Sequence, residues 1–126
     1  MAPINKNHLS TSTAVIEQYA RDPLVYTGNV RVRTGHETMR AIAEALTAVR
    51  AGHLGPTPAL ILHGEDDLLV NIAGSRELMA LLEGSKDKTM VAFPGLKHEL
   101  LSEPGPRGGA EVLRVVVEWL AAHGGA

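Results

Sequence analysis

The chain has 126 residues, of which 44% are hydrophobic and 21% are charged, a composition typical of a globular domain rather than a disordered segment. Its net charge of -2 provides no basic surface for nucleic acid, and the lack of cysteine excludes disulfides, thiolate metal ligands and a cysteine nucleophile. No apolar run approaches membrane-spanning length, and no signal-peptide pattern opens the chain. These features favour a single cytoplasmic domain that does not bind nucleic acid.

The first half of the chain predicts two helices joined by loops, after an irregular lead-in of eleven or so residues. Apolar residues recur at helical spacing over 12–21, and Asp22 precedes a proline, which disfavours helical backbone and should end that helix. Thr34 and Glu37 match a capping box, so a second helix of about four turns should begin there. Glycines and prolines at 52–58 then indicate a linker.

The second half predicts a strand, a helix, a strand and a helix in that order. The apolar run at 59–62, bounded by Pro58 and Gly64, indicates a strand buried on both faces, and 89–93 indicates a second strand. Asn71 is placed to cap the helix between them. This order is that of a right-handed parallel crossover with one helix appended. In the last helix, the residues expected to face inward are Leu113, Val116, Val117, Leu120 and Ala121.

One acid and one histidine follow the two predicted strands. Asp67 comes after the first strand and His98 after the second, at the carboxyl ends where open parallel sheets bind ligands. A nucleophilic triad needs a histidine base and a carboxylate that fixes its tautomer and stabilises the imidazolium. One known triad order places the nucleophile first, then the acid, then the histidine. The pair fits that order, although spacing alone also fits two solvated loop residues.

Four stretches of the chain carry a family resemblance when they are taken together. They are 63–67 (HGEDD), 74–76 (GSR), 93–99 (FPGLKHE) and, earlier in the chain, 21–26 (RDPLVY). The first three resemble the C-terminal part of α/β-hydrolases of the monoacylglycerol lipase and lysophospholipase group, the serine aminopeptidase S33-like family, and the fourth resembles the end of that family's lid. The resemblance implies an α/β fold in which 56–126 forms two parallel strands with flanking helices, preceded by a mostly helical lid remnant at 1–55.

The resemblance also implies roles for individual residues. Asp67 would be the triad acid and His98 the triad base, with a one-residue shift of the acid to Asp66 left open. The substrate would be a lipid-like carboxylic ester, with no cofactor, and the lid would make a peripheral contact with the membrane surface. Residues implied to contact the substrate are Leu24, Val25 and Leu68.

The nucleophile of that family is missing from the sequence. It lies in a Gly-x-Ser-x-Gly elbow, and none of the serines here has those neighbours: Ser10, Ser12, Ser75, Ser85 and Ser102. The chain therefore resembles roughly the last two-fifths of a hydrolase, beginning inside the lid. We expect it to be inactive alone.

Three other functions compete with this interpretation. A metal site could use nitrogen and oxygen ligands among His63, Glu65, Asp66, Asp67 and His98, but no metal-specific spacing recurs. A phosphoacceptor domain would need an acidic pair near the chain start, which is lacking. A non-catalytic protein derived from a hydrolase would expose sheet edges and an apolar face, and these would favour homo-oligomers.

Overall fold

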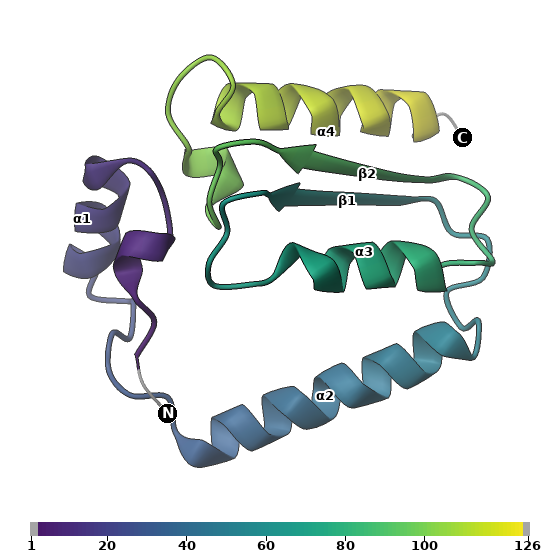
Figure 1. The fold of residues 1–126 in the computed structure, drawn as a ribbon, viewed down its shortest axis with the longest axis horizontal. Helices are drawn as coiled ribbons and strands as arrows, with labels where there is room; N and C mark the ends of the chain where they lie inside the picture. The colour runs from purple at the N-terminus through teal and green to yellow at the C-terminus, as the bar shows by residue number, and fades with distance from the viewer. Residues whose placement is uncertain (1–2, 125–126) are drawn as a thin grey trace.

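The computed structural model describes residues 3–124, which form short helices around a small parallel sheet (Figure 1). In chain order the elements are η1 (Lys6–His8), α1 (Thr13–Arg21), α2 (Val32–Arg50), β1 (Ala59–Gly64), α3 (Ile72–Leu81), β2 (Lys88–Phe93), η2 (Leu100–Ser102) and α4 (Gly109–His123), where η marks a single 3-10 turn. The α/β class and the predicted order of strands and helices are confirmed.

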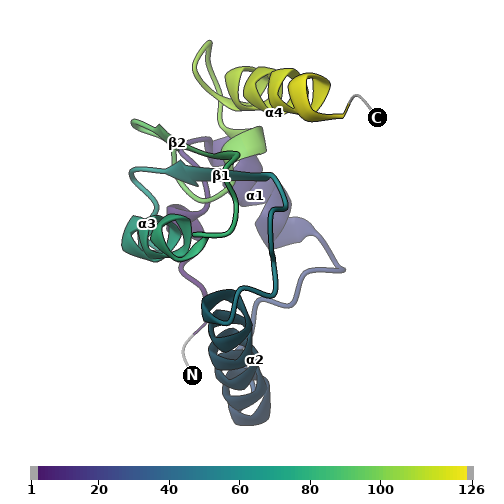
Figure 2. The ribbon, with the colours of Figure 1, turned by 90° about the vertical axis from the view of Figure 1, so that its right-hand side faces the viewer.

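The two strands run parallel, with helix α3 between them in the chain. Their register pairs Ala59 with Lys88 at one end and Gly64 with Phe93 at the other, so both strands end at the same level. Helices α3 and α4 lie on opposite faces of this sheet (Figures 1 and 2). Because both carboxyl ends point the same way, the loops that follow β1 and β2 meet at one edge, which also faces the N-terminal segment (Figure 1).

The core is small and lies between the sheet and α4. Its buried members are Phe93, Leu96 and Val112, and Leu62 and Val115 are among the half-buried residues around them. The expectation that the first strand is buried on both faces was wrong, since the residues from Ala59 to Leu62 are only half-buried. In the described part of the chain the sheet has two strands, so each strand has one edge without a strand partner.

Helix α4 presents a different face to the core from the one its sequence predicts. Val112 is 1% exposed, whereas Leu113 is 53% and Val117 54% exposed. The glycine at the start of the helix explains this rotation, because a Cβ on Gly109 would lie 2.0 Å from the carbonyl oxygen of Leu101. Gly109 therefore lies against η2, and the residue three positions later on the same face, Val112, turns inward.

Two predicted helix caps had different outcomes. The Asn71 side chain accepts a hydrogen bond from the amide of Ala73 at 2.8 Å, so the predicted cap of α3 is confirmed. The capping box at Thr34 was wrong, because α2 starts at Val32 and its first residues are already helical there. The Gly35 amide bonds the carbonyl of Arg31 at 3.1 Å, which closes the first turn ahead of the predicted start.

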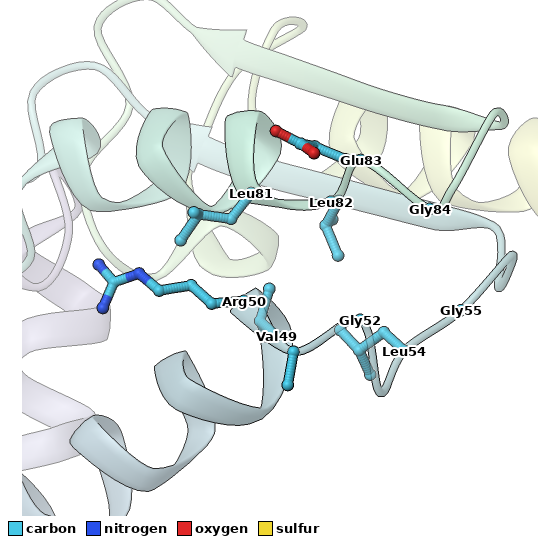
Figure 3. Close-up of a pocket in the computed structure, with 10 residues that line it drawn as sticks. Val49, Arg50, Gly52, Leu54, Gly55, Leu81, Leu82, Glu83 and Gly84 are labelled. Carbon is cyan, nitrogen blue, oxygen red and sulfur yellow. The ribbon is translucent and has the colours of Figure 1, made fainter.

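The end of α2 and the following linker lie beside the end of α3. A cavity of about 350 Å³ separates them, with Leu82 pointing toward the end of α2 (Figure 3). Arg50 bonds Glu77 at 3.1 Å, but both side chains are more than half exposed, so this ion pair adds at most about 1 kcal/mol.

The division of the chain at residue 55 stays a prediction. None of the described helices is long and apolar enough to cross a bilayer.

Candidate active site

The loops after β1 and β2 are in direct backbone contact. A Cβ on Gly64 would lie 2.4 Å from the carbonyl oxygens of both Leu96 and Lys97, so only glycine allows this approach. Next to it, the amide of Asp66 donates to the carbonyl of Leu96 at 3.0 Å, and the amide of Glu65 donates to the carbonyl of Phe93 at the same distance. The glycine that ends the first strand thus fixes one loop against the other.

This contact brings together two side chains that lie 31 residues apart. Nδ1 of His98 is 2.9 Å from Oδ2 of Asp67. The other carboxylate oxygen, Oδ1, accepts the amides of Leu69 at 2.8 Å and Val70 at 3.0 Å. The side chain of Asp67 is 5% exposed, so the carboxylate is buried with its two oxygens bonded.

These contacts set the charge of Asp67. Burial alone would raise its pKa, but the amide of Val70, the hydrogen bond from His98 and the amide of Leu69 together outweigh burial, with the charge interaction with His98 adding to them. The pKa of Asp67 is therefore lowered from its ordinary value. The carboxylate is ionised at neutral pH, as a partner for an imidazolium must be.

His98 is more accessible than its partner. Its side chain is 39% exposed, and in residues 3–124 its ring makes one hydrogen bond, the bond to Asp67. Since a carboxylate only accepts, Nδ1 carries the proton, and the neutral ring keeps a lone pair on Nε2. The ring borders a cleft of about 250 Å³ with Leu62, Val70 and Leu100. A histidine in this state can take a proton from a group placed in that cleft.

His63 supports the acid loop from inside the protein. It is 7% exposed, as expected for a packed and hydrogen-bonded histidine. Its Nε2 lies 3.0 Å from the carbonyl oxygen of Val70, which can only accept, so this nitrogen carries the proton. The hydroxyl of Ser75 then donates to Nδ1 at 2.8 Å, which connects the acid loop to α3.

The other predicted site residues do not line the clefts beside His98. Asp66 and Glu65 are exposed, and the cleft beside His98 includes none of Leu24, Val25 and Leu68. Leu24 is 93% exposed and Leu68 69% exposed. Among the described residues, no group of three or more metal-ligating side chains is placed to hold an ion.

Sequence reasoning missed a buried carboxylate near His98. Glu103 is 4% exposed, and it accepts hydrogen bonds from the amides of Thr11 and Lys97 at 3.0 and 3.3 Å. The segment around Thr11 was expected to be an irregular lead-in, yet Ser10 beside it is 0% exposed. An acid in a loop next to a proline gives no local signal of burial, because its partner lies 92 residues away.

The fold and the placement of this pair define the class of protein: the chain is a segment of an α/β-hydrolase. A crystal structure of a monoacylglycerol lipase from Paleococcus ferrophilus matches it with a TM-score of 0.83 and 30% identity, over 95% of this chain and 44% of that chain. The chain belongs to the family described as serine aminopeptidase, S33, whose model matches residues 1–105.

Curated relatives agree with this assignment. A monoacylglycerol lipase from Mycolicibacterium smegmatis is 30% identical over 95% of this chain and 40% of its own length. A monoglyceride lipase from Mus musculus is also 30% identical, over 94% of this chain and 37% of its own length. A soluble variant of the Saccharomyces cerevisiae monoglyceride lipase shares the fold, with a TM-score of 0.84 at 21% identity. The chain thus spans about two-fifths of the first of these relatives.

Proposed function

We propose that the chain supplies the acid and the base of a serine-hydrolase triad that cleaves carboxylic esters of the monoacylglycerol or lysophospholipid type. The observation that supports this most is the 2.9 Å bond from Nδ1 of His98 to the buried, ionised Asp67. Among the described residues that bond leaves Nε2 of His98 without a hydrogen-bond partner, and the ring borders a cleft, as suits a general base.

The proposed chemistry needs two proton transfers in each half-reaction. Nε2 of His98 takes the hydroxyl proton of a serine as the serine oxygen bonds to the ester carbonyl carbon. Asp67 stabilises the resulting imidazolium, which then gives the proton to the leaving alcohol as the ester bond breaks. Water repeats the sequence on the acyl-serine, releasing the fatty acid and the free serine.

The 126 residues contain no serine in the motif expected for the nucleophile. No Gly-x-Ser-x-Gly occurs in the sequence, and Ser75, which borders the cleft, is bonded to His63. We therefore expect the chain to be inactive alone and to act with a serine from outside it. A fluorophosphonate that labelled this purified chain at a serine would contradict this expectation.

Two observations support a lipid-like ester as the substrate. Apolar side chains surround His98, and the relatives described above are a monoacylglycerol lipase and a monoglyceride lipase. A second cleft, of about 370 Å³, borders the ring and is lined by Leu62, Leu101, Val112 and Val116. Hydrocarbon chains fit such surfaces better than polar acyl groups do. Contacts of Leu24, Val25 and Leu68 with the acyl chain, and a membrane contact of the helical lid at 1–55, belong to the same proposal.

A chimera tests the proposed roles directly. Residues 3–124 would replace the aligned segment of the Mycolicibacterium smegmatis lipase, so that the acid and base come from this chain and the serine from its relative. We expect the chimera to hydrolyse a monoacylglycerol. Asp67→Asn should lower kcat by roughly 10⁴-fold and His98→Ala by roughly 10⁶-fold, as loss of the triad acid and base does.

Asp66→Asn is the matched control, because Asp66 is the neighbouring acid and its side chain is exposed. It should leave kcat unchanged. A folded chimera that keeps its activity after His98→Ala, or that loses it with Asp66→Asn and not with Asp67→Asn, would contradict the assigned roles.

The exposed apolar face of α4 favours a second candidate function, a non-catalytic protein that self-associates. Leu113, Val117 and Leu120 lie at helical spacing and are each more than half exposed. In the described residues each strand of the sheet also has one edge without a strand partner, and such edges add strands from another chain. The oligomeric state of the purified chain, taken up in the Discussion, tests this candidate.

A further inference from the structure

The buried carboxylate of Glu103 lies between the N-terminal segment and the loop that carries His98. It accepts the Thr11 amide through both oxygens, at 3.0 and 3.2 Å, and also the Thr11 hydroxyl. The Lys97 amide donates to Oε1 at 3.3 Å. A carboxylate that is 4% exposed is costly to bury unless donors surround it, so this set of donors holds it in one place.

The two residues that flank His98 are both fixed by this region. On one side, the amide of Lys97 bonds Glu103. On the other side, the amide of Glu99 donates to the carbonyl of Leu9 at 2.8 Å, and Leu9 is itself 3% exposed. The ammonium of Lys97 adds a bond to the carbonyl of Asn7 at 2.8 Å.

Glu103 is also anchored on its other side, by the start of α4. Its carbonyl oxygen accepts the amide of Gly109 at 2.8 Å. A Cβ on Gly108 would lie 2.2 Å from that oxygen, so a glycine is needed for the approach. The backbone of Glu103 is therefore held in place, so its carboxylate can fix the position of the groups that bond to it.

We infer that Glu103 is a positioning residue for His98, and that it works together with Thr11 and the Lys97 amide. These three groups are called the Glu103 clamp below. The clamp holds the peptide before His98 so that Nδ1 of the ring faces Asp67. This inference rests on the proposed role of His98 as the base. A ring that is 39% exposed and makes one hydrogen bond has little else to orient it than its own backbone.

The clamp gives the N-terminal segment a part in the site. Thr11 lies 92 residues from Glu103 in the sequence, yet both of its donors bond the same carboxylate. A purely structural contact would change stability when it is cut and leave the protonation pattern of His98 alone. A positioning contact changes that pattern, and this difference makes the two separable.

NMR of the ¹³C,¹⁵N-labelled 126-residue chain measures the pattern. The shifts of the two ring nitrogens of neutral His98 give the ratio of Nδ1–H to Nε2–H tautomers, and the carboxyl shift of Asp67 gives its pKa. In the natural chain the Nδ1–H form should dominate. In Glu103→Gln the ratio should move roughly three- to tenfold toward Nε2–H, as expected for losing one hydrogen bond, and the pKa of Asp67 should rise.

The matched control is Glu99→Gln, which removes an exposed carboxylate one residue from His98. In the described structure that carboxylate makes no bond to Thr11 or Lys97. It should leave both readouts unchanged. Thr11→Val serves as the milder variant, because it deletes the hydroxyl and keeps every amide donor. It should shift the ratio in the same direction by a smaller factor.

The outcomes separate this inference from the proposed function. If the natural chain lacks a dominant Nδ1–H form, the assignment of His98 as the base fails. If that form is present and Glu103→Gln keeps it while folded, the clamp has no positioning role. Should Glu103→Gln fail to fold, Thr11→Val decides in the same way, and an unchanged tautomer ratio in it overturns the inference.

Discussion

Nδ1 of His98 lies 2.9 Å from Oδ2 of Asp67 because the two strands before these residues end in register, with Gly64 opposite Phe93. The acid is buried and the histidine ring is partly exposed at the edge of a cleft. A partly exposed imidazole bonded to a buried carboxylate suits proton transfer to an external group, which is the role proposed for His98. Four predictions follow from this geometry and from the packing around it.

Asp67 should stabilise the fold in a pH-dependent way. Its pKa is lowered from 3.8 in the folded chain, so its contribution is present above that value and is lost as pH falls through the lowered pKa. At neutral pH, Asp67→Asn should cost about 1.5–3 kcal/mol, the range for hydrogen bonds to a charged group. The difference from the natural chain should shrink on acidification.

Urea unfolding at a series of pH values measures this difference. Asp66→Asn removes an exposed carboxylate at the next position and should show a small difference at every pH. A constant gap between the natural chain and Asp67→Asn across the acidic range would contradict the lowered pKa.

The same substitution at two glycines should have opposite effects. Gly64→Ala places a Cβ 2.4 Å from two carbonyl oxygens, and because both are backbone atoms the loops must separate. We expect a loss of about 1–3 kcal/mol, the usual cost of overpacking, together with a weaker Asp67–His98 bond. Gly74→Ala, in α3, meets open space and should stabilise the chain by about 0.5–1 kcal/mol. Denaturant melts of both variants measure the change in the free energy of unfolding. If the two changes had the same sign, the contact between the loops would be looser than described.

Two neighbouring apolar residues test which face of α4 is buried. Val112 is 1% exposed, so Val112→Ala should cost about 1–3 kcal/mol through lost burial and a cavity. Leu113 is 53% exposed, so Leu113→Ala should change the free energy of unfolding by less than about 0.5 kcal/mol. A larger cost for Leu113→Ala than for Val112→Ala would show that the buried face of α4 is the one predicted by the sequence.

The purified chain should form dimers or larger assemblies rather than a clean monomer. Its unpaired sheet edge and the exposed face of α4 are surfaces that promote association. Val117→Lys places a charge on that face and should shift the population toward monomer. Ala122→Lys adds the same charge outside the Leu113–Val117 row and should change little. Light scattering measures both, and a monodisperse natural chain with a cooperative melt would contradict the prediction.

The sequence was a good guide where the information is local. Apolar runs bounded by proline and glycine predicted both strands, and Asn71 predicted the start of α3. The positions of Asp67 and His98 after two neighbouring parallel strands predicted that they come close. These features depend on neighbours along the chain or on the general rule that parallel strands end at one edge.

The features that the sequence did not predict depend on packing between distant segments. Helix α4 is apolar on more than one side, so its rotation depends on the fit of Gly109 against η2. The burial of Glu103 depends on Thr11, and no pattern in either segment indicates that they meet. The start of α2 also differed, because Arg31 begins the helix without a side-chain cap.

The backbone bonds from Glu65 to Phe93 and from Asp66 to Leu96 have one more consequence. They hold the two loops together, so a movement of one loop should carry both side chains along. In the proposed triad, assembly would then reduce to aligning this preformed half with one serine, and a tilt between the halves would alter the reach of the imidazole while leaving its charge partner in place.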